Sequence, residues 1–131
     1  MIRAKKSLGQ NFLIDREVLE KITNVVQIKD KTILEVGPGT GNLTSFILKK
    51  NPKKMFVIEK DDDLAINLNE TFKDQLTIIN DDILQVDENL IFKNKVTVFG
   101  NLPYNISTEI LSKWITQTKD EFWFNNLILM F

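Results

Sequence analysis

A short apolar run that ends in a glycine-rich turn is the feature that most constrains how this chain folds. Residues 32–36 have the length and composition of a buried strand, and glycines follow at positions 37, 39 and 41. A helical pattern begins directly after the last glycine. Glycines permit a sharp turn and a close ligand, and a helix start offers unpaired N–H groups. The pattern predicts a strand–turn–helix unit that binds a ligand through Glu35, Gly37, Gly39 and Gly41.

Strands and helices are predicted to alternate along the rest of the chain. Further apolar runs predict strands at residues 55–59, 76–79, 96–99 and 127–131. Apolar stripes predict helices near residues 18–25 (with Asp15 as N-cap), 43–50, 61–69 and 106–115. Strands joined through helices need crossover connections, which favour a mostly parallel sheet with helices on both faces. We therefore expect one Rossmann-like α/β domain, without repeats, linkers or a second domain.

The chain stops inside its fifth predicted strand, residues 127–131. An apolar terminal strand at a sheet edge would promote aggregation. We therefore expect residues 1–131 to be the amino-terminal part of a longer catalytic domain, truncated after the fifth strand.

Composition excludes several kinds of chemistry. The 131 residues contain no cysteine and no histidine, which rules out disulfides, thiolate or imidazole catalysis and the usual zinc sites. The formal net charge of −1 gives no overall basic field, although Arg3, Lys5 and Lys6 are locally basic. Neither a secretory signal nor a run of membrane-spanning length is present. We expect a cytoplasmic, monomeric protein that uses no metal and contacts no membrane.

Acidic residues follow the second and third predicted strands. Glu59 can accept hydrogen bonds from both hydroxyls of a ribose. Either Asp81 or Asp82 can accept the exocyclic amine of adenine, with the next backbone N–H meeting a ring nitrogen. Asn42 stands where the dinucleotide motif G-x-G-x-x-G has its last glycine, which argues against NAD. These residues predict an adenosine-type pocket for NAD or S-adenosylmethionine, and do not decide between them.

The tetrapeptide at residues 101–104 indicates the reaction. It follows the fourth strand, at the edge where parallel sheets place ligands. A planar exocyclic amine is a poor nucleophile, but the Asn101 side-chain oxygen and the Leu102 carbonyl can accept its hydrogens and favour a pyramidal nitrogen. Pro103 would fix the backbone, and Tyr104 would stack on a flipped base. We interpret these four residues as the catalytic loop of a methyltransferase that needs S-adenosylmethionine and no general base.

Three segments resemble the ribosomal RNA adenine N6-dimethyltransferase family, which has KsgA and Erm types. They are residues 7–13 (SLGQNFL), 35–44 (EVGPGTGNLT) and 99–108 (FGNLPYNIST). The resemblance implies a class I S-adenosylmethionine-dependent methyltransferase fold and two successive methylations of each target adenine. It implies cofactor contacts from Gln10, Asn11, Leu13, Gly37, Glu59, Asp82, Ile83 and Asn101. Of the two adjacent acids, Asp82 aligns with the acid that the family carries after its third strand.

Residues 8–9 and Leu102 resemble the KsgA branch more than the Erm branch. The implied substrate is a pair of adjacent adenines near the 3′ end of small-subunit (16S) ribosomal RNA, methylated in a pre-30S particle during ribosome biogenesis. The resemblance also implies further sheet strands and a carboxyl-terminal helical RNA-binding domain, so these 131 residues alone are expected to be weak or inactive.

Four other hypotheses stay open at this stage. They are an Erm-type 23S ribosomal RNA dimethyltransferase, a DNA or protein methyltransferase with a related loop, a non-catalytic ribosome-assembly or transcription factor on the same fold, and an NAD-dependent dehydrogenase.

Overall fold

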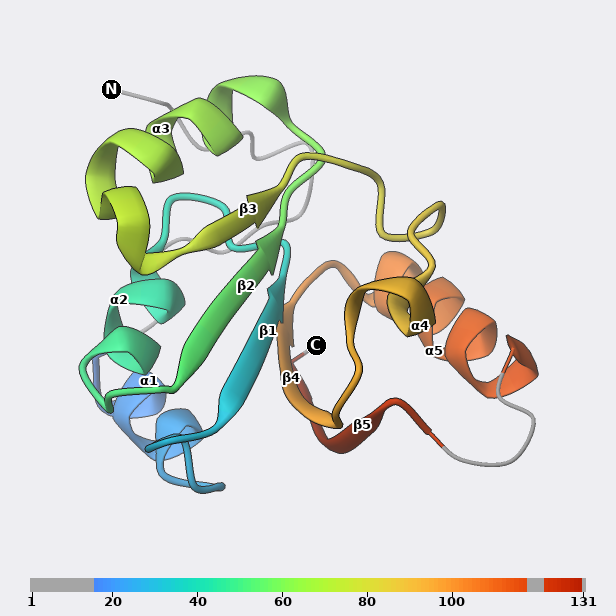
Figure 1. Cartoon of the computed structure of the whole chain (residues 1–131), viewed down its shortest axis with the longest axis horizontal. Coiled ribbons are helices and arrows are strands. Elements are labelled where there is room, and N and C mark those ends of the chain that lie inside the picture. The colour runs from blue at the N-terminus through green and yellow to red at the C-terminus, as the bar shows by residue number, and fades with distance from the viewer. Residues whose placement is uncertain (1–15, 118–121, 131) are drawn as a thin grey trace.

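The computed structural model describes residues 16–117 and 122–130. Their elements, in chain order, are α1 (Arg16–Thr23), β1 (Thr32–Val36), α2 (Asn42–Leu48), β2 (Lys54–Ile58), α3 (Asp62–Phe72), the 3-10 turn η2 (Lys73–Gln75), β3 (Thr77–Ile79), α4 (Glu88–Ile91), β4 (Val96–Asn101), α5 (Tyr104–Gln117) and β5 (Phe124–Met130). All strand pairs are parallel, and the sheet order is β3-β2-β1-β4-β5 (Figure 1). The predicted parallel α/β sheet is confirmed.

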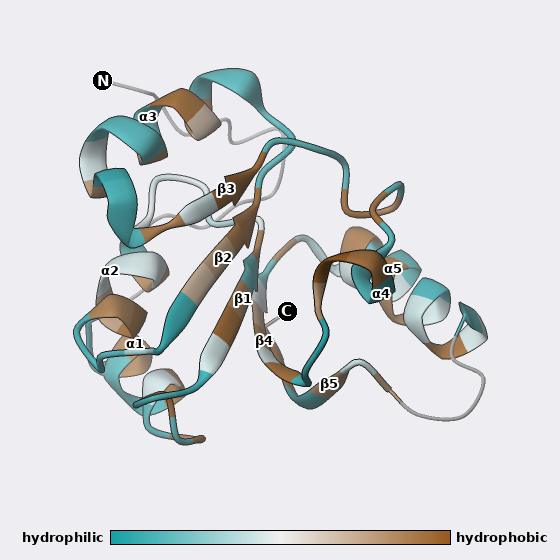
Figure 2. Cartoon of the chain, in the orientation of Figure 1, coloured by the Kyte–Doolittle hydropathy of each residue, from teal (hydrophilic) through white to brown (hydrophobic). Residues whose placement is uncertain are grey.

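The two faces of the sheet carry separate apolar cores. Side chains alternate along a strand, so Ile33 packs with the α1, α2 and α3 layer, whereas Leu34 and Val36 pack with the α4 and α5 layer. In Figure 1 the first three helices lie to the left of the sheet and the last two to the right. Figure 2 shows hydrophobic stretches in the strands, and helices in which hydrophobic and hydrophilic segments alternate. The prediction of helices on both faces is therefore confirmed.

The carboxyl ends of four strands lie in one row across the sheet. Ile79 pairs with Ile58, Ile58 with Val36, and Val36 with Gly100. The chain moves from β1 outward to β2 and β3, and then returns to place β4 on the other side of β1. Parallel α/β sheets bind ligands at such a switch point. The residues that follow this row are therefore brought together at the place where a ligand is expected.

Two elements on the α4 and α5 side of the sheet differ from the prediction. The short helix α4 was not predicted, because four residues are too few to show helical periodicity. Strand β5 begins at Phe124, earlier than the predicted residue 127, since Asn125 and Asn126 interrupt the apolar pattern.

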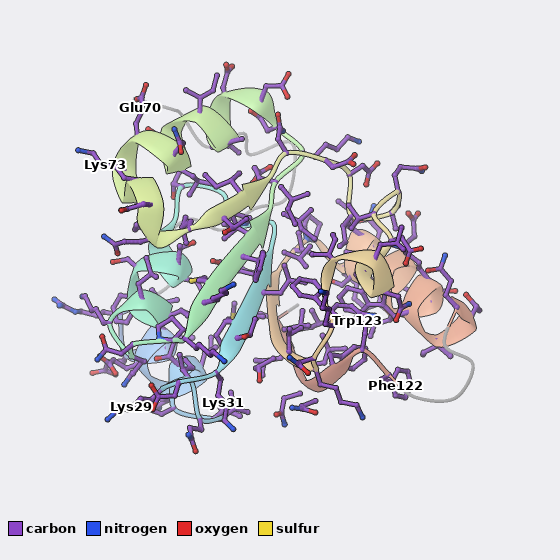
Figure 3. The ribbon with its side chains drawn as sticks, in the orientation of Figure 1. Lys29, Lys31, Glu70, Lys73, Phe122 and Trp123 are labelled. Atoms are coloured by element: carbon purple, nitrogen blue, oxygen red, sulfur yellow. The ribbon has the colours of Figure 1, made fainter. Side chains whose placement is uncertain are left out.

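Aromatic packing holds the start of β5 in place. Trp123 is buried, with its ring centroid 5.7 Å from that of Phe92 and 5.1 Å from those of Trp114 and Phe124. Figure 3 shows it in the dense group of side chains beside α4, β4 and β5. The start of the strand is thus fixed by contacts between elements distant in sequence, which the local pattern does not reveal.

Candidate functional site

The glycine turn after β1 uses backbone conformations that suit glycine. Gly37, Gly39 and Gly41 have φ angles of 67°, 59° and 93°. The Gly37 N–H donates to the Ile58 carbonyl at 3.0 Å, which joins the turn to the end of β2. A Cβ atom added to Gly37 would overlap Cδ2 of Leu102. The glycine turn and the loop after β4 are therefore in direct contact.

Gly41 packs against a different neighbour. It is the N-cap of α2, and a Cβ atom there would lie 2.7 Å from Cε2 of Phe72 in α3. Its lack of a side chain thus allows α2 and α3 to approach each other. The structure gives this predicted site residue a packing role.

Glu59 follows β2 and is buried, so it is not a solvated charge at a strand end. Its Oε1 accepts the Gly39 N–H at 3.2 Å and its Oε2 accepts the Asp61 N–H at 3.0 Å. Burial raises the pKa of the Glu59 carboxyl above its ordinary 4.5, while these two hydrogen bonds oppose the rise. Glu59 thereby joins the glycine turn to the start of α3.

Asn80, which the sequence reasoning missed, supports Glu59 from the neighbouring strand. Its Nδ2 donates to the Glu59 carbonyl at 2.9 Å. An amide side chain directly after a predicted strand, next to two acids, is the signal that could have identified it.

Glu35 lies fully buried in β1 beneath the glycine turn. Thr44 Oγ1 in α2 donates to its Oε1 at 2.5 Å. Burial raises the pKa of the Glu35 carboxyl from 4.5 to about 8; the Thr44 hydrogen bond opposes this rise and the Glu59 charge adds to it. Glu35 therefore ties β1 to α2. Thr44 was not predicted to contribute to the site.

The two acids after β3 have different surroundings. Asp81 is exposed, whereas Asp82 is half-buried and its Oδ1 accepts the Leu84 N–H at 3.0 Å. Lys60 Nζ lies 3.5 Å from Asp82 Oδ2. Ile83 is buried in the core of the α4 and α5 face. The structure thus places Asp82 and Ile83, rather than Asp81, against the body of the protein.

The predicted catalytic loop joins β4 to α5. Asn101 is the last residue of β4, and Leu102 and Pro103 are half-buried. The Pro103 carbonyl accepts the Ser107 N–H at 3.0 Å, in the first turn of α5. Tyr104 begins α5 with 71% of its surface exposed. The side chain of Tyr104 is therefore not packed in the core.

Residues from four strand ends thus line one edge of the sheet. The residues that follow the paired row are Asn80, Glu59, Gly37 and Asn101. Glu59 and Asn101 are two strand spacings apart, about 10 Å.

The predicted residues Gln10, Asn11 and Leu13 lie outside the described residues.

The described part of the chain contains neither a membrane-spanning helix nor a candidate metal cluster. No helix in residues 16–117 or 122–130 is long and apolar enough to cross a membrane. In the same ranges no three acidic side chains are grouped so that they could hold a metal ion.

The contact between Gly37 and Leu102 predicts coupled mutations. Gly37→Ala is expected to lower the free energy of unfolding by about 1–2 kcal/mol from its left-handed φ alone, and further through overlap with Leu102. In a Leu102→Ala background the same change should cost less, because the overlap is gone. Urea unfolding of both single variants and the double variant measures the coupling, expected at roughly 0.5–3 kcal/mol.

Gly41→Ala is the matched control for that cycle. Its added methyl meets Phe72 rather than Leu102, so its effect should add to that of Leu102→Ala within about 0.5 kcal/mol. Additive effects for Gly37→Ala would contradict the contact between the two loops.

Comparison with known proteins agrees with this geometry. The family model described as "Ribosomal RNA adenine dimethylase" matches residues 1–131. The chain is 65% identical over 130 residues to "Ribosomal RNA small subunit methyltransferase A" of Pelagibacter ubique (strain HTCC1062), covering 99% of this chain and 50% of that protein. It spans about half the length of the curated relatives it matches.

Two solved structures share the fold. A dimethyladenosine transferase from Plasmodium falciparum is similar with a TM-score of 0.72 and 26% identity, over 92% of this chain and 42% of that one. The 23S ribosomal RNA methyltransferase ErmE is similar with a TM-score of 0.69 and 26% identity, over 80% of this chain and 43% of that one. With the parallel sheet, these neighbours identify the class I S-adenosylmethionine-dependent methyltransferase fold. Because the family model matches this chain over all 131 residues, the chain belongs to the ribosomal RNA adenine dimethylase family.

Proposed function

We propose that the full-length protein to which this chain belongs transfers methyl groups from S-adenosylmethionine to N6 of adenines in small-subunit ribosomal RNA. It dimethylates two adjacent adenines near the 3′ end of 16S RNA, acting as a monomer on a pre-30S particle in the cytoplasm. The contact between Gly37 and Leu102 is the observation that carries the proposal, since it joins a nucleotide-binding turn to an amine-binding loop. The identity to a relative named small subunit methyltransferase A supports the choice of substrate.

The chemistry of the strand ends fits S-adenosylmethionine. A carboxylate has about four lone-pair sites, so Glu59 can accept both ribose hydroxyls while it keeps its bonds to Gly39 and Asp61. Asp82 would accept the adenine amine, beside the Ile83 N–H. Gly37 and Asn101, with Gln10, Asn11 and Leu13 of the amino-terminal arm, would contact the rest of the cofactor. When bound, the cofactor supplies an electrophilic methyl group.

Glu35 and Gly41 contribute to the same subsite through the shape of the glycine turn. Glu35 holds the start of α2 through Thr44, and Gly41 lets α2 approach α3. Residues 1–131 would thus form the amino-terminal, cofactor-binding part of the catalytic domain.

The loop after β4 would prepare the adenine for attack. The Asn101 side-chain oxygen and the Leu102 carbonyl would accept the two amine hydrogens and direct the nitrogen lone pair toward the methyl donor. Pro103 restricts the backbone of the loop, and the ring of Tyr104, a residue with 71% of its surface exposed, would stack on a flipped base. Accepting the methyl group would leave the nitrogen positively charged, and this strongly acidic cation would lose one proton to water to give the neutral methylated amine. Catalysis is then positioning and electrostatic complementarity.

Labelled-methyl transfer tests the substrate. The full-length protein is incubated with S-[methyl-³H]adenosylmethionine and small or large ribosomal subunits that lack adenine dimethylation. We expect label only in 16S RNA, at two methyl groups on each of two adjacent adenines. Small subunits that already carry the modification are the control and should remain unlabelled.

The other hypotheses predict different outcomes of this assay. Label in 23S RNA alone would favour an Erm-type enzyme and overturn the assignment. Binding of small subunits without any transfer would indicate an assembly factor.

A further inference from the structure

A buried ion pair links α4 to α5. Glu88 is buried and the side chain of Lys113 is only 9% exposed; Lys113 Nζ lies 3.1 Å from Glu88 Oε2 and 3.2 Å from Oε1. The same carboxylate accepts the indole N–H of Trp114 at 2.7 Å. The pair lies on the α4 and α5 face of the sheet, and no step of the proposed methyl transfer uses it.

Lys113 does more than neutralise Glu88. Its Nζ also donates to the Ile83 carbonyl and to the Val86 carbonyl, each at 2.5 Å. An ammonium group has three N–H donors, so two backbone carbonyls and one carboxylate use all of them. Two of the three bonds therefore hold the backbone of residues 83–86.

Those residues continue the turn that begins at Asp82. The Asp82 carbonyl accepts the Gln85 and Val86 N–H groups, and its side chain accepts the Leu84 N–H. These bonds fix the internal shape of the turn. The Lys113 side chain bonds this turn to α5.

Helix α5 also carries the predicted catalytic loop at its other end. It begins at Tyr104, directly after residues 101–103, and Lys113 lies farther along the same helix. A single helix thus contacts both the turn at residues 82–86, which would bind the adenine of the cofactor, and the proposed catalytic loop at residues 101–104.

We propose that Lys113 is a positioning residue. It fixes residues 82–86, the turn that would bind the adenine of the cofactor, relative to the catalytic loop. It thereby sets the selectivity of the cofactor site for adenine. This inference rests on the proposed function, because it assumes that Asp82 and Ile83 contact the adenine of the cofactor. Lys113 donates a hydrogen bond to the carbonyl of Ile83, the residue that follows Asp82. Because this bond fixes the backbone there, the Asp82 carboxylate keeps a constant position.

Cofactor selectivity tests the inference. The full-length protein is titrated calorimetrically with S-adenosylhomocysteine and with S-inosylhomocysteine, in which a keto oxygen replaces the adenine amine. The double variant Glu88→Gln/Lys113→Met removes both charges, so that neither is left buried alone. We expect its preference for the adenine form to fall about fivefold to tenfold, equivalent to one lost hydrogen bond.

Two controls isolate the role of Lys113. Glu88→Gln alone keeps the bonds from Lys113 to Ile83 and Val86, although the loss of the counter-charge should lower its melting temperature. Lys93→Met removes an exposed lysine. Both should keep the wild-type preference. A residue needed only for stability would lower the melting temperature of the double variant without changing this ratio.

Lys113→Arg provides a second variant should the double variant not fold. It keeps the positive charge beside Glu88, but a planar guanidinium cannot donate in the same three directions. It should also lower the preference for adenine. A wild-type preference in either folded variant would overturn the inference alone, whereas absence of S-adenosylhomocysteine binding by the wild-type protein would overturn the proposed function as well.

Discussion

Asn101→Ala in the full-length protein is expected to reduce methyl transfer to small-subunit RNA on the order of 10²–10³-fold, the range for removing one preorganised hydrogen-bonding group. The side chain stands at the end of β4, next to the contact between Leu102 and Gly37. Its oxygen is proposed to hold one hydrogen of the target amine. Tyr104→Ala should also slow transfer, through the loss of ~1–3 kcal/mol of base stacking. Single-turnover transfer of a labelled methyl group measures both effects.

Two matched variants separate these roles from general damage to the loop. Asn105→Ala removes an exposed amide one residue after Tyr104, and Tyr104→Phe keeps the aromatic face. Both should transfer methyl groups at close to the wild-type rate. Since Asn101 is also proposed to touch the cofactor, the affinity for S-adenosylhomocysteine is measured in parallel. Wild-type rates in both alanine variants would refute the assignment of residues 101–104 as the catalytic loop.

Stability is expected to fall as the pH rises from about 5 to 8, because of Glu35. Burial raises the pKa of this carboxyl from 4.5 to about 8 in the folded protein, so the folded state retains a proton that the unfolded chain releases. The contribution of Glu35 is complete below the unfolded pKa and is lost as the pH passes through the folded pKa. The full change is on the order of 5 kcal/mol.

Glu35→Gln tests this titration with little change of shape. The glutamine oxygen can still accept the Thr44 hydroxyl, but the side chain no longer ionises. The variant should match the wild type near pH 5 and be several kcal/mol more stable near pH 8, measured by urea unfolding across this range. Glu59, whose pKa is also raised, remains in both proteins, so the difference between them reports Glu35. Parallel pH profiles would contradict the prediction.

The sequence predicted the strand ends well because their signals are local. An apolar run followed by glycine, acid or amide needs no knowledge of tertiary contacts, and the paired row of strand ends brought Gly37, Glu59 and Asn101 to one edge as expected. The choice between Asp81 and Asp82 could not be made from such signals. It depends on which acid turns toward the protein, and Asp82 does.

The unpredicted features depend on contacts between distant parts of the chain. Lys113 and Glu88 are ordinary surface residue types in sequence, and only the packing of α4 on α5 buries them together. The face of the sheet on which the Glu35 side chain lies could not be predicted either. The pleat of β1 directs its carboxyl toward Thr44, beneath the glycine turn. Sequence patterns therefore located the row of strand ends, but not the hydrogen-bond partners of the buried polar groups beside it.

The two tryptophans pack edge to face, with 83° between their ring planes, so intrinsic fluorescence reports on one side of the molecule only. Both tryptophans of this sequence, Trp114 and Trp123, belong to the core of the α4 and α5 face, with centroids 5.1 Å apart. Their intrinsic fluorescence therefore follows the half of the sheet that carries the proposed catalytic loop. Loosening of α1, α2 or α3, on the opposite face, would be almost silent in emission and would need circular dichroism or hydrogen exchange to detect.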